Sequence, residues 1–82
     1  MGNYKETRQW LRPVLAWAER LENRGAIGQA CEDLGEADIA EGKKAAGIEL
    51  LKRARKEYQL EGYDKSWPEL WDGINKRIKE LE

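Results

Sequence analysis

Residues 44–60, KAAGIELLKRARKEYQL, give the clearest structural signal in the chain. Apolar residues recur in this stretch at helical spacing, whereas the strict alternation of a half-buried strand is absent. The spacing predicts a helix over residues 44–60 with a narrow inner face that consists of Gly47, Leu51, Ala54 and Tyr58. Small residues on and beside this face would let a second helix approach closely, because they keep side-chain bulk out of the contact.

The same helical periodicity extends over most of the chain. It predicts further helices over residues 4–23, 27–34 and 66–81, whereas residues 36–41 could form a short helix or a turn. Residues that favour strands are scarce, since the sequence contains one valine, one threonine and no phenylalanine. We therefore expect an all-α fold, a compact bundle of three to four short helices that forms a single domain over residues 1–82.

Polar residues, glycine and proline mark the expected ends of these helices. Asn3 can cap the first helix, and Gly35 can end the second. Ser66 and Glu69 have the spacing of a capping box at the start of the last helix. Pro68 would then lie in the first turn, where its missing N–H costs nothing.

The segment 4–23 carries two apolar stripes where an ordinary surface helix carries one. One stripe consists of Trp10, Val14, Trp17 and Leu21, and the second, offset by about 100°, consists of Leu11, Leu15 and Ala18. This helix is therefore either packed by neighbours on two sides or offers its second stripe to a partner. Pro13 lies inside the segment, which predicts a kink or a new helix start at that residue.

Tryptophan is unusually frequent, with four residues in a chain of 82. Trp67 and Trp71 begin the apolar seam of the last helix, and we assign both to the core. The other two lie on the first stripe of the segment 4–23. Tryptophan suits the edge of a core or of an interface, because its ring N–H needs a partner. We expect some of the four at such an edge, where tryptophan often dominates protein–protein binding.

The residue types present argue against catalysis. Histidine is absent, which removes the usual general base near neutral pH and the commonest metal ligand. Ser66 is the only serine and has a capping role, and the only cysteine, Cys31, precedes two acidic residues that disfavour its thiolate. We therefore expect no enzyme activity, no cofactor and no metal site, and we interpret Cys31 as a buried apolar residue.

The bulk properties limit the compartment and the partners. No apolar stretch approaches the length that a membrane-spanning helix needs, so we expect no membrane partner. The formal net charge of −1 gives no general attraction to nucleic acid or anionic lipid. One cysteine allows no intramolecular disulfide, which suits a reducing compartment, and we expect a cytoplasmic protein.

Charge is nevertheless unevenly distributed along the chain. Residues 26–42 contain five acidic residues and no basic ones, whereas residues 43–58 contain six basic residues and two acidic ones. Because Glu49 lies among the basic residues on the outer face of this helix, an ordinary solvated face is the preferred interpretation. The alternative is a nucleic-acid-binding surface that includes Lys52, Arg53 and Lys56.

By elimination the sequence favours a non-catalytic protein-binding module that acts through a helical surface. The candidate contacts are on the first helix and in the acidic segment, namely Arg8, Leu11, Arg12, Leu15, Glu32, Asp33 and Glu36. Small helical proteins of this kind are often inhibitors or adaptors, including those made by phages, although no motif supports that association. Two alternatives remain: a nucleic-acid-binding protein that uses residues 43–56, and a self-assembling homodimer that uses the first helix.

Overall fold

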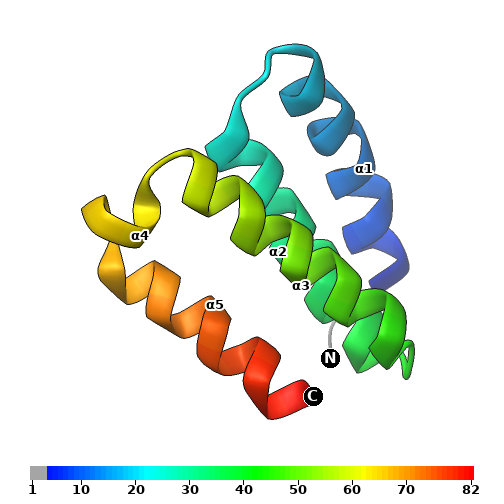
Figure 1. Ribbon diagram of the computed structural model, residues 1–82. Helices are drawn as coiled ribbons and strands as arrows, with labels where there is room; N and C mark the ends of the chain where they lie inside the picture. The colour runs from blue at the N-terminus through cyan, green and yellow to red at the C-terminus, as the bar shows by residue number, and fades with distance from the viewer. Residues whose placement is uncertain (1–3) are drawn as a thin grey trace.

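The computed structural model describes residues 4–82, which form four longer helices and one single-turn helix (Figure 1). The helices are α1 (Tyr4–Arg20), α2 (Arg24–Ala40), α3 (Lys44–Leu60), α4 (Tyr63–Ser66) and α5 (Pro68–Leu81). No strand occurs among the described residues. The radius of gyration of 12.3 Å is close to the value of about 12 Å expected for a compact chain of this length. The predicted all-α bundle is thus confirmed, whereas the predicted cap Asn3 lies outside the described residues.

The helices follow one another as neighbours in space. α2 and α3 form the central pair, α1 packs on α2, and α5 packs on α3 (Figure 1). Among the described helices, the backbone of α1 comes close to α2 alone. A salt bridge of 2.7 Å between Glu19 of α1 and Arg53 of α3 reaches past α2. α1 therefore packs along one side only. Of the two alternatives that its two stripes allowed, helical neighbours on both sides are thus excluded within residues 4–82.

The central pair crosses at two glycines, Gly35 of α2 and Gly47 of α3. A Cβ atom at Gly47 would lie 2.6 Å from the carbonyl oxygen of Gly35, and a Cβ at Gly35 would lie 2.9 Å from the carbonyl oxygen of Gly47. Neither distance is possible for real atoms, so the backbones approach this closely only because both residues lack a side chain. The prediction that Gly35 ends a helix is wrong, because this contact needs glycine inside the helix, and α2 continues to Ala40.

α3 agrees with its prediction in bounds and in orientation. It spans Lys44–Leu60, and its buried residues are the four assigned to the inner face from sequence, Gly47, Leu51, Ala54 and Tyr58. The turn before α3 contains Gly42 at a φ of 86°, a left-handed conformation that glycine adopts without a steric penalty. The turn between α1 and α2 ends at Asn23, whose side chain accepts a hydrogen bond of 3.1 Å from the N–H of Ala26.

The start of the last helix differs from the prediction. The Ser66 hydroxyl donates to the carbonyl oxygen of Gly62 at 3.1 Å and so closes α4, whereas α5 begins at Pro68 with no side-chain cap on Trp67. A serine hydroxyl can bond a carbonyl one turn earlier, and here that bond replaces the predicted capping box with Glu69. Pro68 does lie at the first helical position, as expected.

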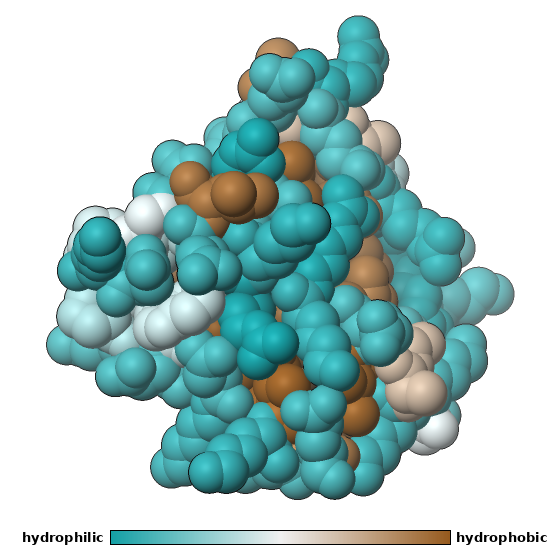
Figure 2. All heavy atoms as spheres, viewed as in Figure 1, coloured by the Kyte–Doolittle hydropathy of each residue, from teal (hydrophilic) through white to brown (hydrophobic). Residues whose placement is uncertain are grey.

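The core extends along the contacts of α1 with α2, of α2 with α3 and of α3 with α5. Its buried members are Ala18, Ile27, Cys31, Leu51, Ala54, Tyr58, Ile74 and Ile78. Figure 2 shows apolar atoms in the seams between helices whose outer surfaces are mostly hydrophilic. Trp71 and Leu81 pack against the core, in agreement with the seam predicted for the last helix. Trp67 is 50% exposed, so its assignment to the core is wrong.

α1 runs without interruption through Pro13, so no new helix starts at that residue. Proline cannot donate to the carbonyl of Gln9 one turn earlier. Both residues are exposed, so water can bond that carbonyl. None of the helices formed by residues 4–82 combines the length and the apolar character that crossing a membrane would need.

Candidate functional site

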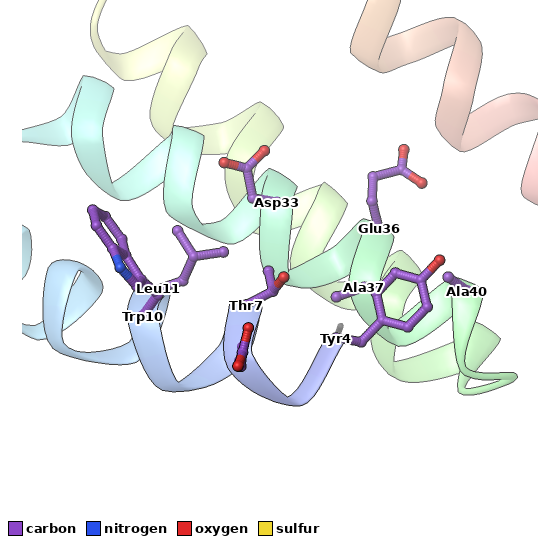
Figure 3. A pocket seen from close by; sticks show the side chains of 9 residues that line it. Tyr4, Thr7, Trp10, Leu11, Asp33, Glu36, Ala37 and Ala40 are labelled. Atoms are coloured by element: carbon purple, nitrogen blue, oxygen red, sulfur yellow. The ribbon is translucent and has the colours of Figure 1, made fainter. Parts of the chain in front are cut away.

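A groove of about 810 Å³ lies between the first half of α1 and the second half of α2 (Figure 3). In that view the rings of Tyr4 and Trp10 stand at opposite ends of the groove, with Thr7 and Leu11 between them on α1. Nine residues line the groove: Tyr4, Glu6, Thr7, Trp10, Leu11, Asp33, Glu36, Ala37 and Ala40. The lining thus combines two aromatic rings, small and aliphatic side chains, and three carboxylates, with no lysine or arginine.

The aromatic wall of the groove continues along α1. Trp10 is 74% exposed, Trp17 is 56% exposed and Leu21, one turn later, is 58% exposed. With the half-buried Val14 these residues stand four, three and four positions apart, which places them on one side of the helix. We call Trp10, Val14, Trp17 and Leu21 the α1 seam. The seam has no helix of residues 4–82 packed over it, since α1 comes close only to α2.

The candidate anchors Leu11 and Leu15 belong to the other stripe of α1, which faces α2. Leu15 packs against the core, and Ala18 of the same stripe is fully buried. Leu11 is half-buried and lines the groove. Leu11, Leu15 and Ala18 of α1 therefore point inward, and its two tryptophans remain at the surface.

The two candidate arginines on α1 differ in their surroundings. Arg8 donates to Asp38 at 2.6 Å and forms a second ion pair with Glu41, so it fastens α1 to the end of α2. The hydrogen bond to Asp38 raises the pKa of Arg8 above its ordinary value. Arg12 is exposed on the side of α1 away from the seam. Arg8 thus has a structural function, and Arg12 is the one of the pair that a partner could reach.

The three candidate acidic residues on α2 also have different partners. Glu32 accepts a hydrogen bond of 2.7 Å from the buried Tyr58 hydroxyl. Glu36 accepts from both the Nε and Nη2 atoms of Arg77 of α5, at 2.9 and 2.8 Å. Glu36 therefore reaches across to the far helix, and only part of its charge is available to the groove.

Asp33 is exposed and accepts a hydrogen bond of 3.3 Å from Gln29 of the same helix. Among the described residues it forms no salt bridge. Desolvation is the largest influence on Asp33 and raises its pKa. The hydrogen bond from Gln29 lowers this pKa, and the charge of the nearby Glu36 carboxylate raises it further. Asp33 is thus a carboxylate at the groove that lacks a cation beside it.

The basic residues proposed for nucleic-acid binding are divided between ion pairs and solvent. Lys52 lies 3.0 Å from Glu82, and Arg53 lies 2.7 Å from Glu19. Lys56 is exposed. Two of the three charges are therefore partly neutralised by acidic residues of the same chain, which reduces the attraction to phosphate.

Cys31 is fully buried in the core, as the sequence predicted. Burial raises the pKa of its thiol. The positive charge of the nearby Arg53 lowers this pKa, and the negative charges of Glu19 and Glu57 raise it. Within residues 4–82 no group of three or more cysteine, aspartate or glutamate side chains is arranged to hold a metal ion.

A second aromatic area lies at the junction of α3, α4 and α5. The rings of Tyr58, Tyr63 and Trp67 follow one another with centroids 5.8 and 5.7 Å apart. Leu60, the last residue of α3, is close to these rings in sequence and is 56% exposed. Figure 2 shows residues of intermediate hydropathy gathered over α4 and the start of α5. Within residues 4–82 neither α4 nor α5 contacts α1, so Trp67 in this area can act as a control position for changes in α1.

The sequence predicted both stripes of α1 and offered the stripe of Leu11 and Leu15 to a partner, whereas in the structure that stripe faces α2 and Leu15 packs against the core. Sequence reasoning also missed the contribution of Tyr4, Ala37 and Ala40 to a groove, because their proximity depends on how α1 and α2 cross. The difference in side-chain size between the two stripes could have shown which stripe packs on α2. Leu11, Leu15 and Ala18 fit a close contact with the alanines of α2, whereas two indoles on one helix would hold the helices apart.

Comparisons with known proteins give no functional assignment. The sequence matches no protein-family model and no curated protein, and no solved structure matches the fold.

Proposed function

We propose that this chain is a non-catalytic protein-binding module that acts as a small adaptor or inhibitor through the α1 seam and the adjoining groove. The observation that carries the proposal is the exposure of Trp10 and Trp17, at 74% and 56%, on a helix with a single helical neighbour. Exposed tryptophans beside a groove are typical of the residues that dominate protein interfaces.

The area of the seam supports this proposal. An indole side chain buries on the order of 200 Å² when fully covered, so covering the exposed parts of Trp10 and Trp17 removes roughly 250 Å² from water. That is about a third of the ~800 Å² that each partner contributes to an interface of standard size. Val14, Leu21 and the groove would add to this area, so the α1 side is large enough for a stable contact.

The nucleic-acid alternative has less support, because Lys52 and Arg53 already face Glu82 and Glu19. The homodimer alternative used the stripe of Leu11 and Leu15, which faces α2 in the structure, so assembly through α1 would now have to use the seam. A reducing compartment such as the cytoplasm would keep the free Cys31 reduced, and we propose that the protein acts there.

The test is affinity capture from a lysate of the source cell, followed by mass spectrometry, with three versions of the chain as bait. The wild type and Trp67→Ala should capture the same protein, and Trp10→Ala with Trp17→Ala should lose it. Trp67 is a matched control, because it is 50% exposed and lies between α4 and α5, neither of which contacts α1. Equal capture by all three baits contradicts the proposal, provided that circular dichroism shows each variant folded.

A further inference from the structure

The groove between α1 and α2 has a chemical character that narrows the kind of partner. Its lining contains the carboxylates Glu6, Asp33 and Glu36 and no basic residue. The aliphatic and small side chains Leu11, Ala37 and Ala40 contribute apolar surface between α1 and α2. A ligand that matches this lining is apolar on one face and positively charged beside it.

The aromatic rings at the groove reinforce the preference for positive charge. Arginine and lysine bind the face of an indole or phenol ring through its quadrupole, and an arginine side chain also stacks its flat guanidinium on the ring. Trp10 is largely exposed and Tyr4 is 37% exposed, so both rings are accessible to such a contact. In Figure 3 the Trp10 ring projects from α1 toward α2, whereas the carboxylates of Asp33 and Glu36 project from α2 away from α1. The rings thus border the groove from α1 and the carboxylates of Asp33 and Glu36 border it from α2, so a helix that covers the groove could present cationic side chains to both.

Asp33 is the clearest electrostatic reason for the groove to prefer a positively charged ligand. Glu36 follows it by three residues on the same helix, so the two carboxylates are one turn apart and repel each other. Arg77 pairs with Glu36, whereas within residues 4–82 the side chain of Asp33 has the Gln29 amide as its hydrogen-bonding partner and no salt bridge. A positive group from a partner would therefore relieve an unfavourable interaction that the folded chain alone does not resolve.

The shape of the α1 seam indicates the conformation of the ligand. The α1 seam extends over twelve residues, from Trp10 to Leu21, or roughly 16 Å along the helix axis. A ridge of side chains at such spacing packs against the grooves of another helix, as in helix-in-groove recognition. An extended peptide would instead seek unpaired strand edges, which the described residues lack.

We propose that the α1 seam and the α1–α2 groove together bind a basic amphipathic helix of another protein, with its apolar face on the seam and its arginine or lysine side chains against Asp33 and the groove rings. This inference rests on the proposed function, because it specifies the partner of the same surface. A second copy of this chain is a different occupant and is an outcome of the test.

The test uses two synthetic helical peptides of roughly 18 residues, long enough for about five turns. One carries leucine on one face and arginine on the flanking positions, and the other has glutamate in place of every arginine. Binding is measured by isothermal titration calorimetry and by the change in tryptophan fluorescence. The arginine peptide should bind at least tenfold more tightly than the glutamate peptide, and added salt should weaken its binding. Equal binding of the two peptides, or a preference for glutamate, overturns the inference.

Two charge-reversal variants locate the binding site. Asp33→Lys should weaken binding of the arginine peptide roughly fivefold or more, because it replaces attraction with repulsion at the groove. Glu49→Lys changes the net charge equally on the exposed face of α3 and should change the affinity less than twofold or so. An equal effect of both variants would mean that the peptide senses only net charge, and the inference would fail.

Two further outcomes keep this inference separate from the proposed function. If the tryptophan-dependent partner is captured but the chain does not prefer the arginine peptide, the proposed function stands and the basic-helix inference fails. If sedimentation shows a dimer that Trp10→Ala with Trp17→Ala converts to a monomer, the occupant of the seam is a second copy, which also overturns the inference.

Discussion

The crossing of α2 and α3 predicts that two glycine-to-alanine substitutions in long helices change stability in opposite directions. Gly47 lies in α3 at the closest approach to α2, whereas Gly73 lies in α5. A Cβ at Gly47 would lie 2.5 Å from Cγ1 of Ile39 and 2.6 Å from the carbonyl oxygen of Gly35. A Cβ at Gly73 would meet no atom within 4 Å. The two substitutions are chemically identical and differ in the space available.

The structure sets the size of the expected difference. Alanine is favoured over glycine in a helix by about 1 kcal/mol, and this gain applies equally at both positions. Gly73→Ala should therefore stabilise the protein by roughly 0.5–1 kcal/mol. At Gly47 one of the two clashing atoms is backbone and cannot rotate away, so the overpacking cost should reach about 3 kcal/mol, the upper part of its usual range. Gly47→Ala should then destabilise by roughly 2 kcal/mol, after subtraction of the helix gain.

The assay is thermal and urea unfolding followed by circular dichroism. For a domain of this size each kcal/mol shifts the melting temperature by about 4–8 °C, so the variants should melt roughly 10–24 °C apart. Gly35→Ala should behave like Gly47→Ala, because its Cβ would lie 2.9 Å from the carbonyl oxygen of Gly47. If Gly47→Ala and Gly73→Ala both raise the melting temperature, the two helices do not cross at these glycines and the reasoning is refuted.

Two further predictions concern buried titratable groups. Burial, together with the hydrogen bond to Glu32, raises the pKa of Tyr58 above its ordinary value of 10.0. The folded chain therefore holds this proton to higher pH than the unfolded chain does, and the free energy of unfolding should fall as pH rises above about 10. Tyr58→Phe should lose that component of the alkaline decrease, and at neutral pH it should cost about 1.5–3 kcal/mol, the net value of a hydrogen bond to a charged group. Parallel declines in urea titrations of both proteins between about pH 8 and pH 11 would contradict this assignment. Cys31, fully buried with a thiol pKa raised by burial, should react with a disulfide reagent only as the protein unfolds. Rapid labelling of the native protein, at a rate independent of urea at low concentration, would show that the thiol is accessible.

The parts of the fold that sequence predicted correctly depend on local patterns. The bounds and the inner face of α3 follow from helical spacing within a single segment. The inward seam of Ile74 and Ile78 in α5 follows from the same kind of pattern, and both residues are buried. In each case the local preference and the packing in the fold agree, so the pattern was sufficient.

The predictions fail where a residue is required by a contact with another helix, which the local sequence does not reveal. A Cβ at Gly28 would lie 2.5 Å from the Tyr58 ring, and Gly35 faces Gly47, so both glycines serve contacts with α3. Read in isolation, Gly35 looked like a helix end, and the predicted second helix was shortened at both ends. Ser66 failed for a different reason, because its hydroxyl had two possible backbone partners, and the bond to Gly62 formed in place of the capping box.

The candidate site shows the same division between local pattern and packing. The two stripes of α1 were visible in the sequence, but their directions depend on the fit against α2. Asp33, Glu36 and Leu11 were candidates from sequence and do line the groove, although no spacing rule connected α1 to α2. Tyr4 and Trp10 line the same groove because of the way α1 and α2 cross, which the sequence does not specify.

The placement of the tryptophans bears on why α1 has this composition. A helix whose only role is to cover α2 would gain stability by turning its largest apolar residues inward. α1 instead packs Leu15 and Ala18 against the protein and leaves Trp10 and Trp17 at 74% and 56% exposure. Such exposure brings a risk of aggregation and little stability, so a function that requires the indoles is the simplest reason for it. It also means that the seam can be altered with little effect on folding: Trp10→Ala should change stability by less than about 0.5 kcal/mol. Any loss of binding in that variant would then report on the surface itself, because the core that holds α1 in place does not include Trp10.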